Sequence, residues 1–300
     1  MDTLRGSLGT HILCITTVAR ATYGETARRP IYYILLLSFG VALYFSRLLT
    51  LFAFYQETPM VREMGMATLS FWGFLVLALS SGLVVTRELE DRTAVTLLSK
   101  PLRREDFLLG KYAGLMAALI PGFIVLSGVL FLTLWLMTAA DLPIRDRDVA
   151  LGIGQGKSAA QVVWNATWTH FIADQGGIVL QGAFLAFLQC TLLGALAVSF
   201  AAFFPLVVSV GAITAVFVLG NVSSYMLASV ENMNVKAVSL LGRLVTYLFP
   251  NLGYFNLQTY FSDGTMISVR YLGWSLAYAG LYVAAVFLVS CSLFQRREIR

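Results

Sequence analysis

Six apolar stretches, each about as long as a membrane-spanning helix, dominate the sequence of 300 residues. A helix needs about 20 mostly apolar residues to cross the hydrocarbon core of a bilayer. The stretches are 31–51, 64–85, 112–137, 178–203, 206–228 and 271–294. Only 12% of the residues are charged, against about 25% in a soluble domain. We therefore predict an all-α polytopic integral membrane protein, with six transmembrane helices in a single domain, 1–300.

The lysines and arginines predict how these helices are oriented. Segments on the cytoplasmic side of a membrane carry an excess of both residues. Most of the basic residues fall in cytoplasmic segments if the N-terminus is inside. We expect both termini inside (N-in/C-in) in a multi-pass protein of the cytoplasmic membrane, the inner membrane of a bacterium. Because the basic residues are scattered between apolar runs, they do not indicate nucleic-acid binding.

Three segments outside the spans have predicted structures of their own. Residues 1–30 carry one apolar stripe at helical spacing, which is typical of a cytoplasmic helix in the membrane interface. Residues 138–177 form an outer loop. Residues 229–270 are apolar enough for a seventh span, but Lys236 and Arg243 make crossing costly. An outer re-entrant or interfacial segment before the last span is the favoured alternative.

The densest charge in the chain lies in residues 86–111, between the second and third spans. Pro101 removes a backbone donor and disfavours helical geometry at Lys100, so we expect the chain to bend there and a new helix to begin after it. Val95, Leu97 and Leu98 stand at this bend between charged flanks. The segment is either a solvated charged hairpin or a docking surface, and apolar groups rimmed by charge favour docking.

Within this segment the sequence resembles a known family. The agreement covers about fifteen positions at one spacing: Glu88, Asp91, Arg92, Thr93, Leu97, Leu98, Ser99, Lys100, Pro101, Arg104, Phe107, Leu109, Gly110, Lys111 and Tyr112. This run is similar to the signature of ABC-2-type permeases, the membrane subunits of ATP-binding-cassette exporters. Six spans, an N-terminal elbow helix and an outer segment before the last span also agree in layout. The segment between the third and fourth spans is longer than in compact members of the family.

The resemblance implies a mechanism and a set of partners. The loop after the second span would form a coupling helix in a cleft of a separate ATP-binding subunit, which binds ATP and Mg. Two permease copies, as a homodimer or a heterodimer, would work with two ATPases among membrane lipids. The chain itself would have no catalytic site, metal or cofactor, and would not be an enzyme. The implied coupling residues are Glu88, Asp91, Arg92, Thr93, Val95, Leu97, Leu98, Ser99, Lys100, Pro101, Arg104, Phe107, Gly110 and Lys111.

Polar and small residues within the spans leave two interpretations open. Gln181, Gln189 and Asn221 could line a substrate pathway or form hydrogen bonds between helices, and helix packing is favoured. The pairs Gly211/Ala215 and Gly280/Ala284 have the small-xxx-small spacing of close helix contacts, without indicating the partner.

Two other classes of function compete with the permease. An ATP-independent secondary transporter or channel is the alternative, but no Asp, Glu or Lys falls in the middle of a predicted span. A lipid-modifying enzyme would need a metal or acid–base site. Asp141, Asp146 and Asp148 alternate with arginines as in a solvated loop. The stretch GIGQGKS, 152–158, imitates a phosphate-binding loop, but its first glycine stands one position too late.

Overall fold

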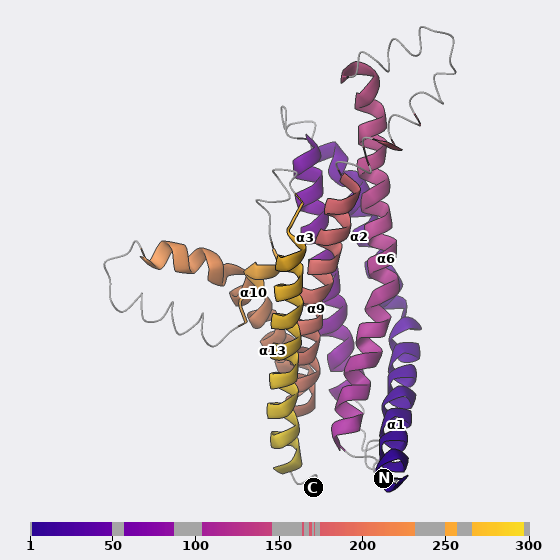
Figure 1. Ribbon diagram of the computed structural model, residues 1–300, viewed down its shortest axis with the longest axis vertical. Coiled ribbons are helices and arrows are strands. Elements are labelled where there is room, and N and C mark those ends of the chain that lie inside the picture. The colour runs from indigo at the N-terminus through magenta and orange to yellow at the C-terminus, as the bar shows by residue number, and fades with distance from the viewer. Residues whose placement is uncertain are drawn as a thin grey trace.

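The computed structural model describes residues 2–49, 57–86, 104–145, 164, 168–169, 171, 175–231, 250–256 and 266–296. Within these ranges there are helices and no strand, so the all-α prediction is confirmed. The α-helices, shown in Figure 1, are α1 (Asp2–Ala27), α2 (Pro30–Leu49), α3 (Glu57–Ser81), α6 (Arg104–Arg145), α9 (Gly177–Phe203), α10 (Leu206–Glu231) and α13 (Val269–Arg296). A π-helix, η2 (Gly82–Thr86), continues α3, and a 3₁₀-helix, η4 (Leu252–Phe255), precedes α13.

Four of these helices, α3, α6, α9 and α13, are long and apolar enough to cross a membrane. A fifth crossing results if α1 and α2 are counted as one bent span. The sixth predicted span corresponds to α10, whose described apolar part is only Leu206–Val222. The chain thus has the helices of a multi-pass membrane protein, whereas the count of six spans stays a prediction.

The first helix pair bends by 62° between Ala27 and Pro30. Pro30 supplies no backbone N–H, so it begins a helix more readily than it continues one. The last turn of α1 closes instead through Arg28, whose N–H donates to the Gly24 carbonyl at 3.2 Å. We call this junction the elbow. It divides the predicted interfacial segment, 1–30, from the first apolar helix.

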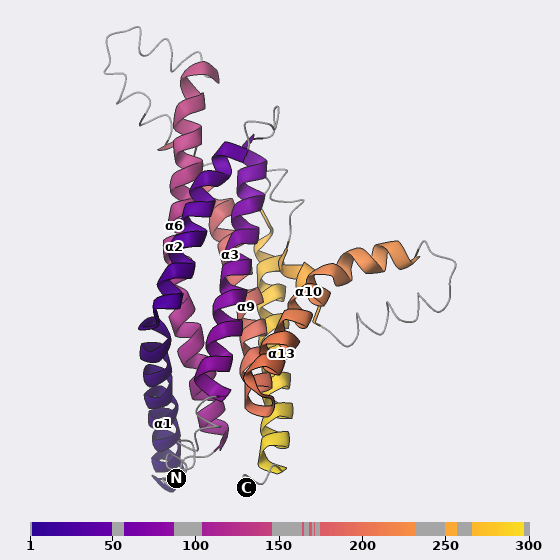
Figure 2. The same cartoon turned by 180° about the vertical axis from the view of Figure 1, so that it is seen from behind.

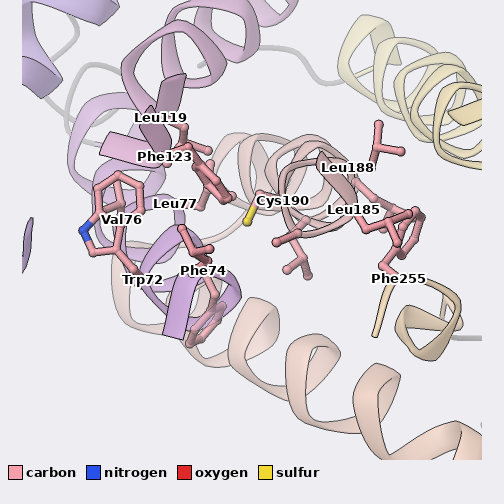
Figure 3. Packing of buried hydrophobic residues seen from close by; sticks show 14 of the residues in the cluster. Trp72, Phe74, Val76, Leu77, Leu119, Phe123, Leu185, Leu188, Cys190 and Phe255 are labelled. Carbon is pink, nitrogen blue, oxygen red and sulfur yellow. The ribbon is translucent and has the colours of Figure 1, made fainter. Parts of the chain in front are cut away.

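The core is built around α9, which packs against α3, α6, α10 and α13. About 67% of its apolar window is buried, against 17% for α13 at the periphery. Figure 3 shows Cys190 of α9 directed toward Leu77 of α3 and Phe123 of α6. Gly122 lies against the Trp72 ring, so a small residue in α6 admits the largest side chain of α3. Close packing of this kind replaces the hydrophobic drive that lipid-embedded helices lack.

The two helices α9 and α10 are joined by a tight turn at Phe204 and Pro205. Phe204 is extended, and its N–H donates to the Phe200 carbonyl at 2.8 Å. Figures 1 and 2 show α10 rising beside α9 and then turning outward, away from the other helices. Of the predicted outer segment 229–270, the structure describes the end of α10 and 250–256 and 266–270, where the Asn251 side chain caps η4.

With 42 residues, α6 is the longest helix. At 1.5 Å per residue it measures about 63 Å, roughly twice the hydrocarbon thickness of a bilayer. The predicted restart of a helix after Pro101 agrees with its first residue, Arg104. At the other end α6 continues to Arg145, into the segment that the sequence assigned to an outer loop.

Candidate functional site: the start of α6 and its contacts

Most of the predicted coupling segment falls outside the described residues. This applies to Glu88, Asp91, Arg92, Thr93, Val95, Leu97, Leu98, Ser99, Lys100 and Pro101. Arg104 is the first residue of α6, and its side chain is also outside the described set. The site is therefore built from the helices on either side, which are η2 and the first two turns of α6.

The last residue of η2 and the first residue of α6 lie at the same end of the bundle. Figures 1 and 2 show the start of α6 beside the start of α1, with the end of α13 at the same level. The chain approaches the coupling segment through η2, whose five residues have π-helical hydrogen bonding. Short π segments are rare and are found frequently at functional sites. A Cβ on Gly82 would lie 3.3 Å from Leu206, so this turn touches the beginning of α10.

The three described coupling residues, Phe107, Gly110 and Lys111, all lie against the protein rather than in solvent. Phe107 is buried in the core cluster. Lys111 is only 3% exposed, and its Nζ stands 5.5 Å from the centre of the Phe107 ring. The two residues are one helical turn apart, and the ring face stabilises the ammonium group through a cation–π contact. These two residues thus order the first turns of α6.

Gly110 and Gly114 form the surface of α6 on which α1 packs, which we call the glycine seat. A Cβ on Gly110 would stand 2.7 Å from Val18 Cβ, and one on Gly114 would stand 2.5 Å from the Ala19 carbonyl oxygen. Real Cβ atoms do not approach other heavy atoms this closely, so α1 can occupy its position only because both residues are glycine. The spacing G-x-x-x-G places both on one face of α6. The resemblance implied a coupling role for Gly110, and the contact with α1 is a finding of the structure.

A hydrogen bond between two side chains closes the same interface nearer the end of the bundle. His11 Nδ1 of α1 lies 2.7 Å from Asp106 Oδ2 of α6. Asp106 is buried, and it stands in the first turn of α6, where a carboxylate interacts favourably with the helix dipole. Sequence reasoning did not connect these residues, which are 95 positions apart. An acidic residue in the first turn of a helix is the one signal that was visible.

The three polar residues inside the spans all form hydrogen bonds. The side-chain amide of Gln181 donates to the Ile267 carbonyl at 3.2 Å and accepts from the Ile267 N–H at 2.8 Å. Gln189 donates to Asn221 at 3.2 Å, joining α9 to α10. Asn221 in turn donates to the Phe217 carbonyl of its own helix at 2.8 Å. Gln189 and Asn221 thus join two helices, whereas Gln181 joins α9 to the residues just before α13, and a pathway role stays a prediction.

Two further polar contacts were not expected from the sequence. Arg62 was assigned to the segment before the second span, but it lies within α3, is only 2% exposed and donates to Gln175 at 2.8 Å. Ser290 of α13 donates to Ser199 of α9 at 2.8 Å within the buried face between them. Both contacts join helices far apart in the sequence, which an apolar pattern along one helix does not reveal.

Metal-ligating residues do not gather in the part of the chain that the structure describes: no group of three His, Cys, Asp or Glu side chains could hold an ion there. Cys14, Cys190 and Cys291 are free thiols. Asp146 and Asp148, which the enzyme hypothesis would need, lie outside the described residues, as do the side chain of Asp141 and the stretch GIGQGKS.

Comparison with known proteins leaves the family of the chain open. No protein-family model matches it, and no curated protein matches it.

Proposed function

We propose that the chain is the permease subunit of an ATP-binding-cassette exporter of the ABC-2 type, driven by a separate ATP-binding subunit. The observation that carries the proposal is the run of about fifteen signature-like residues from Glu88 to Tyr112. This run connects α3, which η2 extends, to α6. Both helices reach the same end of a membrane-type bundle. A signature of this kind has a mechanical meaning only where two spanning helices emerge together.

The described geometry supports a route for coupling. The coupling segment is continuous with η2 on one side and with α6 on the other. The π turn touches α10 through Gly82, and α6 holds α1 through Gly110 and Gly114. A push on the segment would therefore tilt α3 and α6, and would carry α10 and α1 with them. Transport then consists of shifting one packing arrangement toward another, which needs no chemical step in this chain.

Association with the ATPase is the first property to test. The full-length chain would be purified from its native membranes in mild detergent, and ATP hydrolysis by the preparation would be measured. Replacing Leu98 with Asp places a charge in the predicted apolar contact, and we expect it to remove the hydrolysis that co-purifies with the chain. The double charge reversal of Glu88 and Arg92 should act in the same way.

A matched control reverses one acidic and one basic residue at the predicted opposite side of the membrane, Asp146 and Arg147. This variant should retain the hydrolysis. Normal co-purification of the ATPase with Leu98→Asp would refute the coupling assignment. Transport by the purified chain alone, driven by an ion gradient, would replace the permease with the secondary-transporter alternative.

A further inference from the structure

The elbow between α1 and α2 contains a basic hollow of about 570 Å³. We call it the elbow pocket; its lining consists of Arg20, Ala21, Gly24, Glu25, Arg28, Arg29 and Pro30. The volume lies in the range of sites that hold small ligands, about 300–1,000 Å³. Three arginines line it against a single carboxylate, so the pocket attracts an anion.

The arginines differ in what they already contact. Arg29 is paired with Glu25 one helical turn earlier. Arg20 and Arg28 are exposed and form no ion pair with any residue that the structure describes. Guanidinium groups bind phosphate through two parallel hydrogen bonds, and they are more easily desolvated than ammonium groups. A phosphate between Arg20 and Arg28 would balance the positive charge of these two arginines, as Glu25 balances that of Arg29.

An apolar surface continues directly from the pocket. Ile34, Leu37 and Val41 follow Pro30 at four, seven and eleven residues, which places all three on one face of α2. All three are exposed. From Pro30 to Val41 the helix rises about 16 Å, which is close to half of the roughly 30 Å hydrocarbon core. A charged pocket followed by an apolar face one leaflet long has the shape and polarity of a phospholipid.

A different face of α1 is already occupied. Gly110 and Gly114 of α6 hold α1 at Val18 and Ala19, whereas Arg20 and Arg28 of the elbow pocket are exposed. No described atom would lie within 4 Å of a Cβ on Gly24, in agreement with open space there. Basic residues beside a span also help to set topology, but that role requires only their charge and not a hollow.

We propose that the elbow pocket binds the phosphate of an anionic phospholipid, whose acyl chains lie along the exposed face of α2. The shared chemistry is a phosphate between two arginines, and the apolar face selects the lipid over a free anion. The lipid would fasten the elbow to one leaflet, and α1 with it.

Binding can be measured by native mass spectrometry of the full-length chain in detergent, titrated with phosphatidylglycerol, phosphatidylcholine or inorganic phosphate. We expect retention of phosphatidylglycerol in preference to the zwitterionic lipid, and no displacement by millimolar phosphate. Arg28→Gln should weaken retention about tenfold, the effect typical of losing one charge-assisted hydrogen bond. Arg20→Gln, across the pocket, should do the same.

Two variants test whether the effect belongs to the pocket. Arg270→Gln removes an exposed arginine at the start of α13, and it should leave retention unchanged. Glu25→Gln removes the one carboxylate of the pocket, and it should strengthen retention, which a loss of fold could not do. Equal retention of both lipids, an equal loss in Arg270→Gln, or saturation by inorganic phosphate alone would overturn the proposal.

Discussion

The same spacing of small residues occurs in α6, where it packs on α1, and on the outer face of α13. Among the described residues, the spacing is filled by a neighbouring helix in α6 but lies open in α13. At Gly110 and Gly114 the backbone of a neighbouring helix fills the space that a side chain would take. At Gly280, and also at Gly211 of α10, no described atom would lie within 4 Å of a Cβ. The spacing therefore permits a close approach without causing one, and the helix that fills it is decided by the rest of the fold.

The largest expected loss of stability comes from adding a side chain at the contact between α6 and α1. Gly114→Ala would place a Cβ 2.5 Å from the Ala19 carbonyl oxygen, which belongs to a helix backbone and cannot rotate away. We expect a loss of about 3 kcal/mol of stability, at the upper end for overpacked sites. The free energy of unfolding in detergent micelles, titrated with sodium dodecyl sulfate, measures it, and cleavage by trypsin after Arg20 should accelerate. Gly24→Ala on α1 is the control, because that position is open.

The hydrogen bond between His11 and Asp106 at the same interface should contribute less. His11→Ala leaves the buried Asp106 carboxylate without the 2.7 Å contact, at an expected cost of about 1–2 kcal/mol. A double-mutant cycle with Asp106→Ala isolates the pairwise energy. A coupling energy near zero would show that the glycine seat alone holds α1 on α6.

Hydrogen bonds from polar side chains of α9 stabilise the bundle in a third way, which we expect to be weaker again. Gln189→Leu removes one bond to Asn221 and should cost about 0.6 kcal/mol, the average for polar pairs inside membranes. Gln181→Leu removes two bonds to the Ile267 backbone and should cost roughly twice as much. The same detergent titration measures both. If the two losses are equal, the second bond at Ile267 adds nothing.

The smallest loss is expected at the open glycines. Gly211→Ala and Gly280→Ala meet no described neighbour, so the unfolding free energy of the isolated chain should not fall, and helix propensity should raise it by up to about 1 kcal/mol. A large loss at either position would mean that a second copy, or a segment outside the described residues, fills the space. A cross-linking experiment from a cysteine at the same position would then identify the neighbour.

Hydropathy predicted the helices of the bundle closely. The predicted spans 31–51 and 178–203 compare with Pro30–Leu49 and Gly177–Phe203 in the structure. An apolar run has a clear signature because a bilayer imposes the same length on each crossing. Hydropathy missed the charged turns at helix ends, as at Glu57–Glu63 of α3 and at the end of α6, because a charged helical turn looks like a charged loop.

Contacts between helices were less accessible to sequence reasoning. Gln181, Gln189 and Asn221 stood out because polar residues are rare in apolar runs, and each forms a hydrogen bond. His11 and Asp106 stood in polar surroundings, so nothing in either sequence neighbourhood indicated the other. The π turn at Gly82–Thr86 has no composition of its own, because its five residues are as apolar as the helix before it.

Because α6 is long, a small tilt of this helix would displace its far end by several ångströms. If the helix of about 63 Å tilted as one body by about 5° about one tip, the other tip would move by roughly 5 Å. Because Gly110 and Gly114 pack tightly on α1 near one end of α6, α1 would move with that end. Farther along α6, the Trp135 ring packs against the Trp164 and Trp168 rings, at centroid distances of 5.2 and 6.1 Å. A tilt of α6 would therefore displace α1 near one end and shift this tryptophan contact toward the other.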